Sequence, residues 1–497
     1  MYDLDAVAAG LQNLFQLHVL ASLLVGFALG FIVGAIPGFN DANLMAILLP
    51  FTLFLDAMTA IVAMSALYFG AQAAGSIPAI LINVPGTPGT AASTLEGYPM
   101  ARRGQAGLAL GISFAASTFG AVFGSVAAIV LSPIIGAFAL RFGPAEMFMI
   151  AVFGLTVVSS LTGDDIWKGL LASAFGVLIA MVGADGMTAF ERGTFGILHL
   201  YDGVPLIPVL LGLFGFSEVL FLMREQAVAS GESVRGKGEI FRGVRECLRH
   251  RVTLLRSSII GTIIGIIPGA GATIGSFVAY GQARQWSREP EKFGTGHPDG
   301  LVATDSANNA VAAGAVVPLL TLGLPGSASA TVMLAALVLH GVRPGPRFFL
   351  NFQTEAYTIL FSLFIASALI ALVGLPAARS FRAVAFLPTR ILVPIVGVLL
   401  FTGAFAWRFL GFDILVMVVF GLLGVAMKVG GYPIPAFLLA FILGSLLETC
   451  FLQTVRIGGY GLFFGSPITI TLWVLTILSL LAPVIMKLGR RRDKARG

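Results

Sequence analysis

Residues 14–43 read LFQLHVLASLLVGFALGFIVGAIPGFNDAN, an apolar run with no Lys, Arg, Asp or Glu before Asp41. About 20 apolar residues are enough for a helix to cross the hydrocarbon core of a bilayer. Pro37 removes a backbone donor and Gly38 permits non-helical dihedrals, so this pair breaks the helix. In a membrane such a break is tolerated only where its backbone is buried in protein or lines a wet cavity. The stretch therefore predicts a discontinuous membrane helix.

The composition extends this prediction to the whole chain. Of 497 residues, 57% are apolar and 11% are charged, whereas a soluble domain has about 25% charged residues. The mean hydropathy is +0.95. These values exclude a secreted disulfide scaffold, a disordered regulator and a water-soluble enzyme. We expect an all-α polytopic membrane protein with about 10–12 transmembrane helices, at about 20 residues per crossing. The expected crossings include 14–36, 106–134, 167–182, 206–223, 257–280, 331–339, 356–375, 414–427 and 468–486.

Charged segments predict the organisation along the chain. Residues 225–256 contain too many charged side chains to lie in the hydrocarbon core of a bilayer. We therefore expect this segment to be a cytoplasmic linker between a first half, 1–224, and a second half, 257–497. The basic run Lys487–Arg496 predicts a cytoplasmic C-terminus. The start, with Asp3 and Asp5 but no Lys or Arg, lacks the basic region of a signal peptide, so the first span is expected to be retained.

The two halves repeat a pair of Pro-Gly motifs in the same order. GAIPG at 34–38 recurs as GIIPG at 265–269, and NVPGT at 83–87 corresponds to GLPGS at 323–327. Paired interruptions at matching places predict two inverted repeats with broken, discontinuous or re-entrant helices, the pattern of a secondary transporter's substrate site. Freed helix N-termini can receive an anion, and freed carbonyls can hold a cation such as Na⁺. For single glycine pairs such as Gly26/Gly30 and Gly120/Gly124, helix packing is the favoured interpretation.

Polar residues gather beside these breaks. Asn40, Asp41 and Asn43 follow the first break and could hold a cation or cap the next helix. Asp305 precedes an uncharged run, where its alternatives are a functional carboxylate and an interfacial N-cap. We predict cation coupling by Asp41, Asn43 and Asp305. We predict substrate binding by Pro37, Gly38, Asn40, Asn83, Pro85, Gly86, Thr87, Gly269, Thr273, Asn308, Asn309, Pro325, Gly326 and Ser327.

Motifs for catalysis are absent from the sequence. It contains no H-E-x-x-H, no G-x-S-x-G and no Walker-type loop, and its few histidines are scattered. Cys247 and Cys450 lack the neighbours that a disulfide, zinc or thiol-redox site requires. We therefore expect no enzyme, no nucleic-acid binding, no cofactor and no metal beyond the coupling ion, Na⁺ or H⁺.

Several motifs resemble the large membrane subunit of the tripartite tricarboxylate transporters. They are the Pro37-Gly38 break with its following apolar run, NVPGTP at 83–88, EGYPM at 96–100, SANNA at 306–310 and PLLTLGLPGS at 318–327. The resemblance covers nearly the whole chain, and the block 294–346 is its most specific part. The family pattern carries over onto Pro37, Gly38, Asn83, Pro85, Gly86, Thr87, Asn308, Asn309, Pro325, Gly326 and Ser327.

The resemblance implies a cation-coupled uptake system of three parts in a bacterial inner membrane. Its partners would be a small four-helix membrane subunit and an extracytoplasmic binding protein that delivers a carboxylate, citrate among the family's substrates. Two departures concern the substrate. Phe39–Asn43 replaces the family's small stretch, which places Asp41 where a carboxylate would be repelled unless a cation or proton is present. Asp305-Ser306 replaces the family's Glu, which keeps the charge on a shorter side chain.

Other functions remain open at this point. A stand-alone cation-coupled carboxylate carrier would have the same sequence features. An intramembrane enzyme would require a nucleophile with a base, or a metal cluster, in the spans. A channel would require a ring-like pore lining and no paired breaks. For a transporter, rocking and elevator motions fit the sequence equally well.

Overall fold

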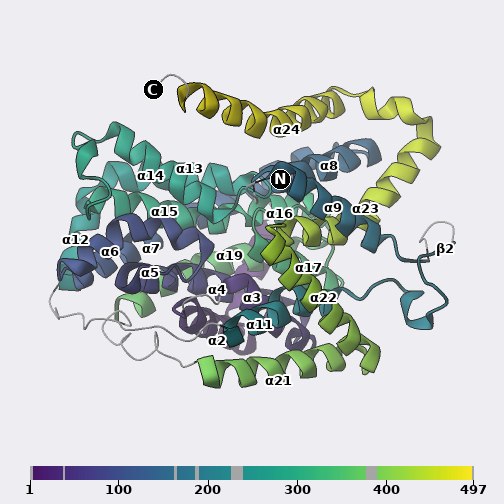
Figure 1. Cartoon of the computed structure of the whole chain (residues 1–497), viewed down its shortest axis with the longest axis horizontal. Coiled ribbons are helices and arrows are strands. Elements are labelled where there is room, and N and C mark those ends of the chain that lie inside the picture. The colour runs from purple at the N-terminus through teal and green to yellow at the C-terminus, as the bar shows by residue number, and fades with distance from the viewer. Residues whose placement is uncertain are drawn as a thin grey trace. The chain divides into compact units, whose positions relative to one another are not determined.

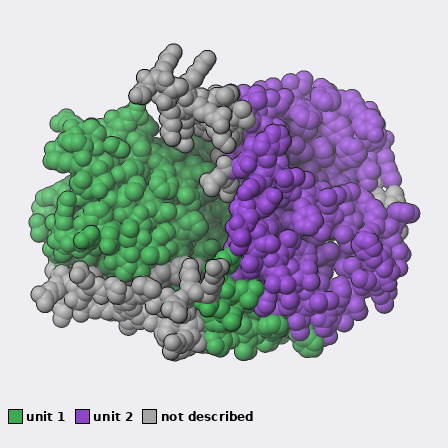
Figure 2. Space-filling model, viewed as in Figure 1, with its two compact units in different colours: residues 1–137, 218–406 green, residues 138–217, 407–497 purple. Residues whose placement is uncertain are grey.

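The computed structural model describes residues 4–36, 40–161, 165–184, 190–224, 239–376 and 389–494, and these are almost entirely helical (Figure 1). The chain forms two compact units, shown in separate colours in Figure 2. Unit 1 comprises residues 1–137 and 218–406, and unit 2 comprises residues 138–217 and 407–497. Each unit therefore takes segments from both halves of the sequence. The division into repeat halves around a linker at 225–256 stays a prediction, and the described part of that linker is helical.

Unit 1 contains both pairs of Pro-Gly motifs. Its first group of helices is α1 (Leu4–Leu14), α2 (Leu17–Gly34), α3 (Asp41–Leu48), η1 (Leu49–Phe54), α4 (Ala57–Ala74), α5 (Ser76–Ile82), η2 (Pro88–Ser93), α6 (Thr94–Arg102) and α7 (Ala106–Ala139). Its second group is α11 (Ser217–Arg224), α12 (Glu239–Arg249), α13 (Arg251–Ile266), α14 (Gly271–Trp286), η5 (Pro290–Lys292), α15 (Pro298–Gly314), α16 (Val316–Leu322), α17 (Ala328–Leu339), α18 (Phe348–Asn351), α19 (Gln353–Leu369), η6 (Ile370–Gly374) and α21 (Thr389–Arg408).

Glycines allow the central helices of unit 1 to approach closely. A Cβ atom on Gly26, Gly30 or Gly34 of α2 would overlap a backbone carbonyl oxygen of α4. In the same way, a Cβ on Gly261 or Gly265 of α13 would lie 2.5 or 2.6 Å from a carbonyl oxygen of α15. Gly120 and Gly124 of α7 also face the α15 backbone. The packing interpretation of Gly26, Gly30, Gly120 and Gly124 is therefore confirmed, as expected for membrane helices that associate without a hydrophobic driving force.

The two broken segments share one local geometry. α4 and α5 meet at Gly75, and α15 and α16 meet at Ala315. After each short helix the chain turns through a left-handed residue, Asn83 (φ 60°) or Gly323 (φ 73°). The following glycine then returns to the break, since a Cβ on Gly86 would lie 2.8 Å from Gly75 Cα and one on Gly326 would lie 2.9 Å from Ala315 Cα. The repeated motifs thus have equivalent surroundings, while the inverted relation of the halves stays a prediction.

Unit 2 is built around α8 (Pro144–Leu161), α9 (Ile166–Ala180) and α23 (Ile434–Gly458). Arg192 pairs with Glu448 of α23 at 2.5 and 2.9 Å, so a half-buried carboxylate in this unit has a cationic partner. The unit's other elements are β1 (Gly183–Ala184) and β2 (Glu191–Arg192), which pair antiparallel, with η3 (Leu198–Leu200), α10 (Leu206–Leu210), the π-helix η4 (Leu211–Phe216), α22 (Gly411–Gly430), η7 (Tyr460–Phe464) and α24 (Pro467–Lys494).

Several expected crossings need correction. The described ranges contain seven helices that are long and apolar enough to cross a membrane: 17–34, 57–82, 106–139, 206–223, 353–374, 411–430 and 434–458. The expected crossing 257–280 is wrong, because α13 ends at Ile266 and α14 begins only at Gly271. Ala328–Leu339 has 12 residues and spans about 18 Å, too short to cross alone. The spans 57–82 and 434–458 are not among the crossings named from the sequence, and Glu448 and Arg456 interrupt the apolar run of the second.

Gly30→Val tests the close approach of α2 and α4. The new side chain would overlap the Leu67 carbonyl group, so we expect a stability loss of about 2 kcal/mol or more from overpacking. Gly281→Val in α14, where a Cβ would meet open space, should change stability by less than about 0.5 kcal/mol. Chemical denaturation of the purified variants in one detergent measures both. Equal stability of the two variants would contradict the packing assignment.

Candidate functional site

The first buried carboxylate of unit 1 lies where two helices begin. Asp41 is the first residue of α3, and its Oδ2 accepts hydrogen bonds from Gln72 Nε2 of α4 at 2.9 Å and from Ser329 Oγ of α17 at 2.5 Å. Ser329 is the second residue of α17. Asp41 is only 2% exposed. The positive ends of two helix dipoles therefore face one buried acid, an arrangement that favours negative charge there.

The second buried carboxylate, Asp305, lies within α15 rather than at its start. The N-cap of α15 is His297, so the interfacial N-cap interpretation of Asp305 is wrong. Its Oδ1 accepts from Ser76 Oγ of α5 at 3.0 Å and from Ser93 Oγ of η2 at 2.5 Å. The helix break at Gly75 and the turn after Pro85-Gly86 bring these two hydroxyls to α15. Two hydroxyls from the first half of the sequence thus bind one carboxylate of the second half.

Gln72 links Asp41 to α15, the helix that carries Asp305. Its side chain donates to Asp41 and accepts from Thr87 Oγ1 at 3.3 Å. Its backbone carbonyl accepts from Asn308 Nδ2 of α15 at 3.4 Å. Tyr68, one turn earlier on α4, shares a hydrogen bond of 3.1 Å with Ser327 Oγ at the start of α17. The last turns of α4 therefore hold the starts of α3 and α17 and the middle of α15.

Three buried acceptor oxygens of α15 have no hydrogen-bond partner in the part of the chain that the structure describes. They are Asp305 Oδ2, Asn308 Oδ1 and Asn309 Oδ1. Ser113 Oγ faces the Asp305 carboxylate but forms no hydrogen bond of good geometry with it. Residues three and four apart share one face of a helix, so these oxygens belong to one side of α15. A buried acceptor without a donor is costly, and carboxylate and amide oxygens are the ligands that hard cations prefer.

The electrostatics of the site lack a fixed positive charge. Among the described residues, no Lys, Arg or His forms an ion pair with Asp41 or Asp305. The surrounding side chains are hydroxyls and amides. A dicarboxylate or tricarboxylate entering such a site would meet two acids and no counter-charge. Binding of an anion here therefore requires a cation or protons to enter with it.

The structure places the predicted site residues in several environments. Asn40 is the N-cap of α3, where its side chain accepts from Asn43 N at 2.9 Å, so its capping role is confirmed. Pro85, Gly86 and Thr87 lie in the turn against Gly75, and Pro325, Gly326 and Ser327 lie in the matching turn. Asn83 is exposed, whereas Asn308 and Asn309 are buried. Pro37 and Gly38 lie outside the described residues. Ligand contacts at all these positions stay predictions.

The second-half break at Gly269 is tied to the Pro325-Gly326 turn. Gly269 N donates to Pro325 O at 3.3 Å, and Gly271 N donates to Gly326 O at 3.0 Å. Thr273 follows in the first turn of α14 and is half-buried. These bonds satisfy backbone groups that the helix break frees, as a membrane interior demands. Gly89 of η2 is a further close approach, because a Cβ there would overlap Asn308 Oδ1.

Sequence reasoning missed Gln72 and Tyr68. Both lie in the apolar segment 57–74, and Gln72 is its one amide side chain. A polar side chain inside an apolar span is costly unless it has a partner, and this signal could have identified Gln72. Tyr68 resembles an ordinary core aromatic, so only its contact with Ser327 distinguishes it.

Two contacts outside the apolar spans position the start of α15. The buried carboxylate of Glu96 accepts from Tyr280 Oη at 2.8 Å and from the backbone N–H groups of Gly294, Gly296 and His297 at 2.6–2.7 Å.

His250 Nδ1 lies 2.8 Å from Asp299 Oδ1, joining the start of α13 to the first turn of α15. The Asp299 carboxylate raises the pKa of His250 above 6.5, against the effect of burial. Burial raises the pKa of Asp299, but the neighbouring His250 and Thr253 side chains outweigh this effect and hold the pKa below 3.8.

The His250–Asp299 pair predicts a pH-dependent stability. Because the pKa of His250 is raised in the folded state, its protonation stabilises the fold fully below pH 6.5, and this stabilisation is lost as the pH rises through the folded pKa. Because the pKa of Asp299 is lowered, its ionisation stabilises the fold above pH 3.8, and this stabilisation is lost as the pH falls below that value. The loss of stability in His250→Gln should therefore be greatest between these two pH values. Glu246 and His297 also face His250. Thermal denaturation across pH, with His199→Gln as control, measures this; equal losses at pH 5.5 and pH 9 would contradict it.

Comparison with known proteins adds to this geometry. Residues 20–439 match a family described as the tripartite tricarboxylate transporter TctA family. A 52.8 kDa protein in the TAR-I ttuC' 3' region of Agrobacterium vitis is 32% identical over 473 residues, which cover 95% of this chain and 94% of that protein. A protein in the TAR-II ttuC' 3' region of the same organism is 30% identical over 237 residues, which cover 47% of this chain and 98% of that protein. No solved structure matches the chain.

Proposed function

Because the chain belongs to the tripartite tricarboxylate transporter TctA family, we propose that it imports carboxylates as the large transmembrane subunit of a binding-protein-dependent secondary transporter. The substrates are tricarboxylates such as citrate, or related organic carboxylates, and the coupling ion is Na⁺ or H⁺. The observation that carries the proposal concerns the described residues: three acceptor oxygens on α15 have no partner among them, these oxygens lie beside hydroxyl-bound carboxylates, and no fixed positive charge from these residues pairs with the site.

The chemistry of this site supports co-transport. Asp305, Asn308 and Asn309 offer oxygen ligands for a cation, and Asp41 offers a second acidic position. Binding of a cation or proton removes the repulsion that a carboxylate would meet there and offsets its desolvation. The helix starts at Asp41 and Ala328 then provide backbone N–H groups for the anion. Neither ligand is stabilised without the other, which is the physical requirement for coupling.

Alternating access would follow from the repeat. Two inverted halves would place the broken segments near the bilayer midplane, and a rocking or an elevator motion would expose them to either side. The family and the seven apolar helices establish a multi-pass membrane protein. We propose the bacterial inner membrane as its location, with the 225–256 segment and the C-terminus in the cytoplasm. The proposed partners are a small four-helix membrane subunit and an extracytoplasmic binding protein.

Uptake of labelled citrate and other carboxylates into proteoliposomes tests this proposal. We expect concentrative uptake that requires an imposed Na⁺ or H⁺ gradient, the binding protein and the small subunit. Ion-driven uptake without the binding protein would support a stand-alone carrier instead. Flux that neither saturates nor proceeds against a gradient would indicate a channel and contradict the proposal.

Asn308→Ala combined with Asn309→Ala removes two of the unpartnered oxygens. We expect uptake to fall below about a tenth of wild type, since each lost ligand contact removes 1 kcal/mol or more. Asn351→Ala, at an exposed position of α18, is the matched control and should transport normally. Uptake per membrane-inserted protein is the measurement, and normal uptake by the double variant would remove both residues from the site.

Asp41→Asn separates ion coupling from capture of the anion by the binding protein. Loss of a buried charge that accepts two hydrogen bonds should shift the ion concentration for half-maximal uptake by about tenfold or more. Delivery by the extracytoplasmic partner should be unaffected. Asp202→Asn, at an exposed position in unit 2, is the control. An unchanged ion dependence in Asp41→Asn would place the coupling site elsewhere.

A further inference from the structure

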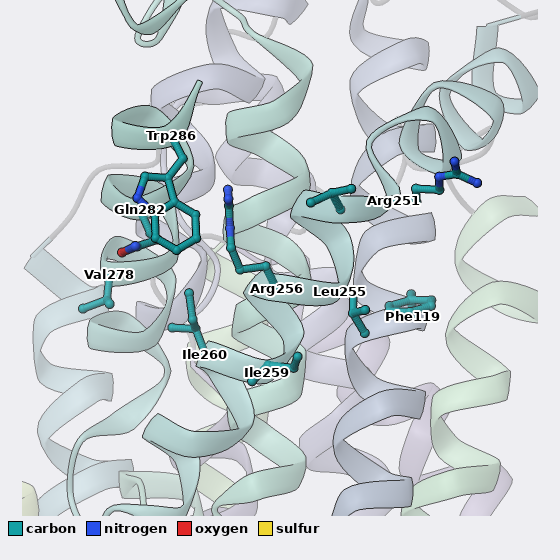
Figure 3. Close-up of a pocket in the computed structure, with 10 residues that line it drawn as sticks. Phe119, Arg251, Leu255, Arg256, Ile259, Ile260, Val278, Gln282 and Trp286 are labelled. Carbon is teal, nitrogen blue, oxygen red and sulfur yellow. The ribbon is translucent and has the colours of Figure 1, made fainter. Parts of the chain in front are cut away.

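An open groove in unit 1 lies apart from the carboxylate site. It has a volume of about 740 Å³, within the range of about 300–1,000 Å³ that small-molecule sites occupy. Ten residues of α7, α13 and α14 line it, and neither Asp41 nor Asp305 is among them. Figure 3 shows its arrangement: Arg256 lies beside Trp286 at one end, Arg251 is set apart and points away from Arg256, and Ile259 and Ile260 lie further along the groove.

The basic end of the groove has positive charge without a protein counter-ion. In the described ranges, no carboxylate pairs with Arg251 or Arg256. Arg256 Nε is buried and donates no hydrogen bond within these ranges. The Arg256 guanidinium stacks over the Trp286 ring, 4.4 Å from its centroid, so the aromatic side chain holds it at this end (Figure 3). The Arg256 guanidinium, held in place by Trp286, can bind an anion from outside the protein.

The rest of the groove is apolar and open on one side. Leu255, Ile259 and Val278 are each 42–45% exposed along its wall. Exposed apolar surface of this kind is stabilised by contact with acyl chains. Trp side chains are enriched at the level of lipid headgroups. The groove thus has a charged end and an apolar wall, as a lipid molecule has a charged headgroup and apolar acyl chains.

We propose that this groove binds an anionic glycerophospholipid of the surrounding bilayer. The phosphate lies against Arg256 beside Trp286, Arg251 adds positive charge at a separate place on the groove, and one acyl chain follows Leu255, Ile259 and Val278. Gln282 at the same end adds an amide for the headgroup. Basic pockets between membrane helices recognise anionic headgroups by this combination of charge and apolar surface. A soluble anion would gain nothing from the apolar wall, and a zwitterionic lipid would gain little from two unpaired arginines.

The proposal is independent of transport and is tested by binding. The full-length protein is purified in detergent and titrated with phosphatidylglycerol or phosphatidylcholine whose acyl chains are brominated, because bromine quenches a tryptophan that it contacts. Unbrominated lipids with the same headgroups correct for other changes in fluorescence. We expect phosphatidylglycerol to quench at a concentration about tenfold or more below that of phosphatidylcholine. Trp286→Phe should remove the saturable part of the quenching.

Charge variants then locate the headgroup. Arg251→Gln with Arg256→Gln should weaken phosphatidylglycerol binding about tenfold or more. Arg242→Gln with Arg245→Gln, at exposed positions of α12 outside the groove, makes the same change in net charge and should leave binding within about twofold. Val278→Phe narrows the groove without changing its charge and should also weaken binding. Each variant must retain the size-exclusion profile of wild type.

Four outcomes would overturn the proposal. Equal quenching by the two lipids would remove the role of charge, and equal effects of the two double-arginine variants would remove this location. Inorganic phosphate that displaces the brominated lipid at millimolar concentration would identify a site for a free anion. Loss of lipid binding when a second protein subunit is co-purified would assign the groove to that subunit.

Discussion

The constraint on which unit 1 depends is the need to satisfy peptide groups where a helix breaks away from water. Lipid offers no hydrogen bonds, so a break must be enclosed by protein. The Pro85-Gly86 turn returns to Gly75, where Gly86 N donates to Gly75 O at 3.1 Å. The second Pro-Gly turn instead accepts from Gly269 and Gly271 of the neighbouring break. Only glycine tolerates these approaches, which explains why the breaks occur as Pro-Gly pairs.

The enclosed breaks bring polar groups from distant parts of the sequence to two carboxylates. Asp41 is bound by α4 and α17, and Asp305 is bound by α5 and η2. In each case a carboxylate from one half of the sequence accepts a hydrogen bond from a serine of the other half. A site assembled in this way cannot form from one half alone. The Gln72 side chain donates to Asp41, and the Gln72 backbone carbonyl accepts from Asn308 of α15. The end of α4 therefore links Asp41 to the helix that carries Asp305.

The charged side chains of unit 1 fall into two groups that differ in their partners. In the core, two acids are bound by neutral hydroxyls and amides, so their interactions change with whatever cation or proton arrives. At the ends of the spans, charges are paired and bonded: Glu96 accepts from three backbone N–H groups, and Asp299 pairs with His250. The paired charges hold α15 in place, and the unpaired acceptors on the same helix remain free for ligands. The structural and functional charges are thereby separated along one element.

The sequence by itself determined the membrane class, the packing of Gly26, Gly30, Gly120 and Gly124, and the interruptions at Pro85-Gly86, Pro268-Gly269 and Pro325-Gly326, because these depend on local composition and on the backbone preferences of Pro and Gly. It also identified Asp41, Asp305, Asn308 and Asn309 as polar residues in apolar surroundings. Only the tertiary structure decided that Asp305 lies inside α15, that Gln72 and Tyr68 belong to the site, and that each unit combines both halves. Those features arise from contacts between residues 31 to 288 positions apart, and no local pattern encodes which distant partner a side chain will meet.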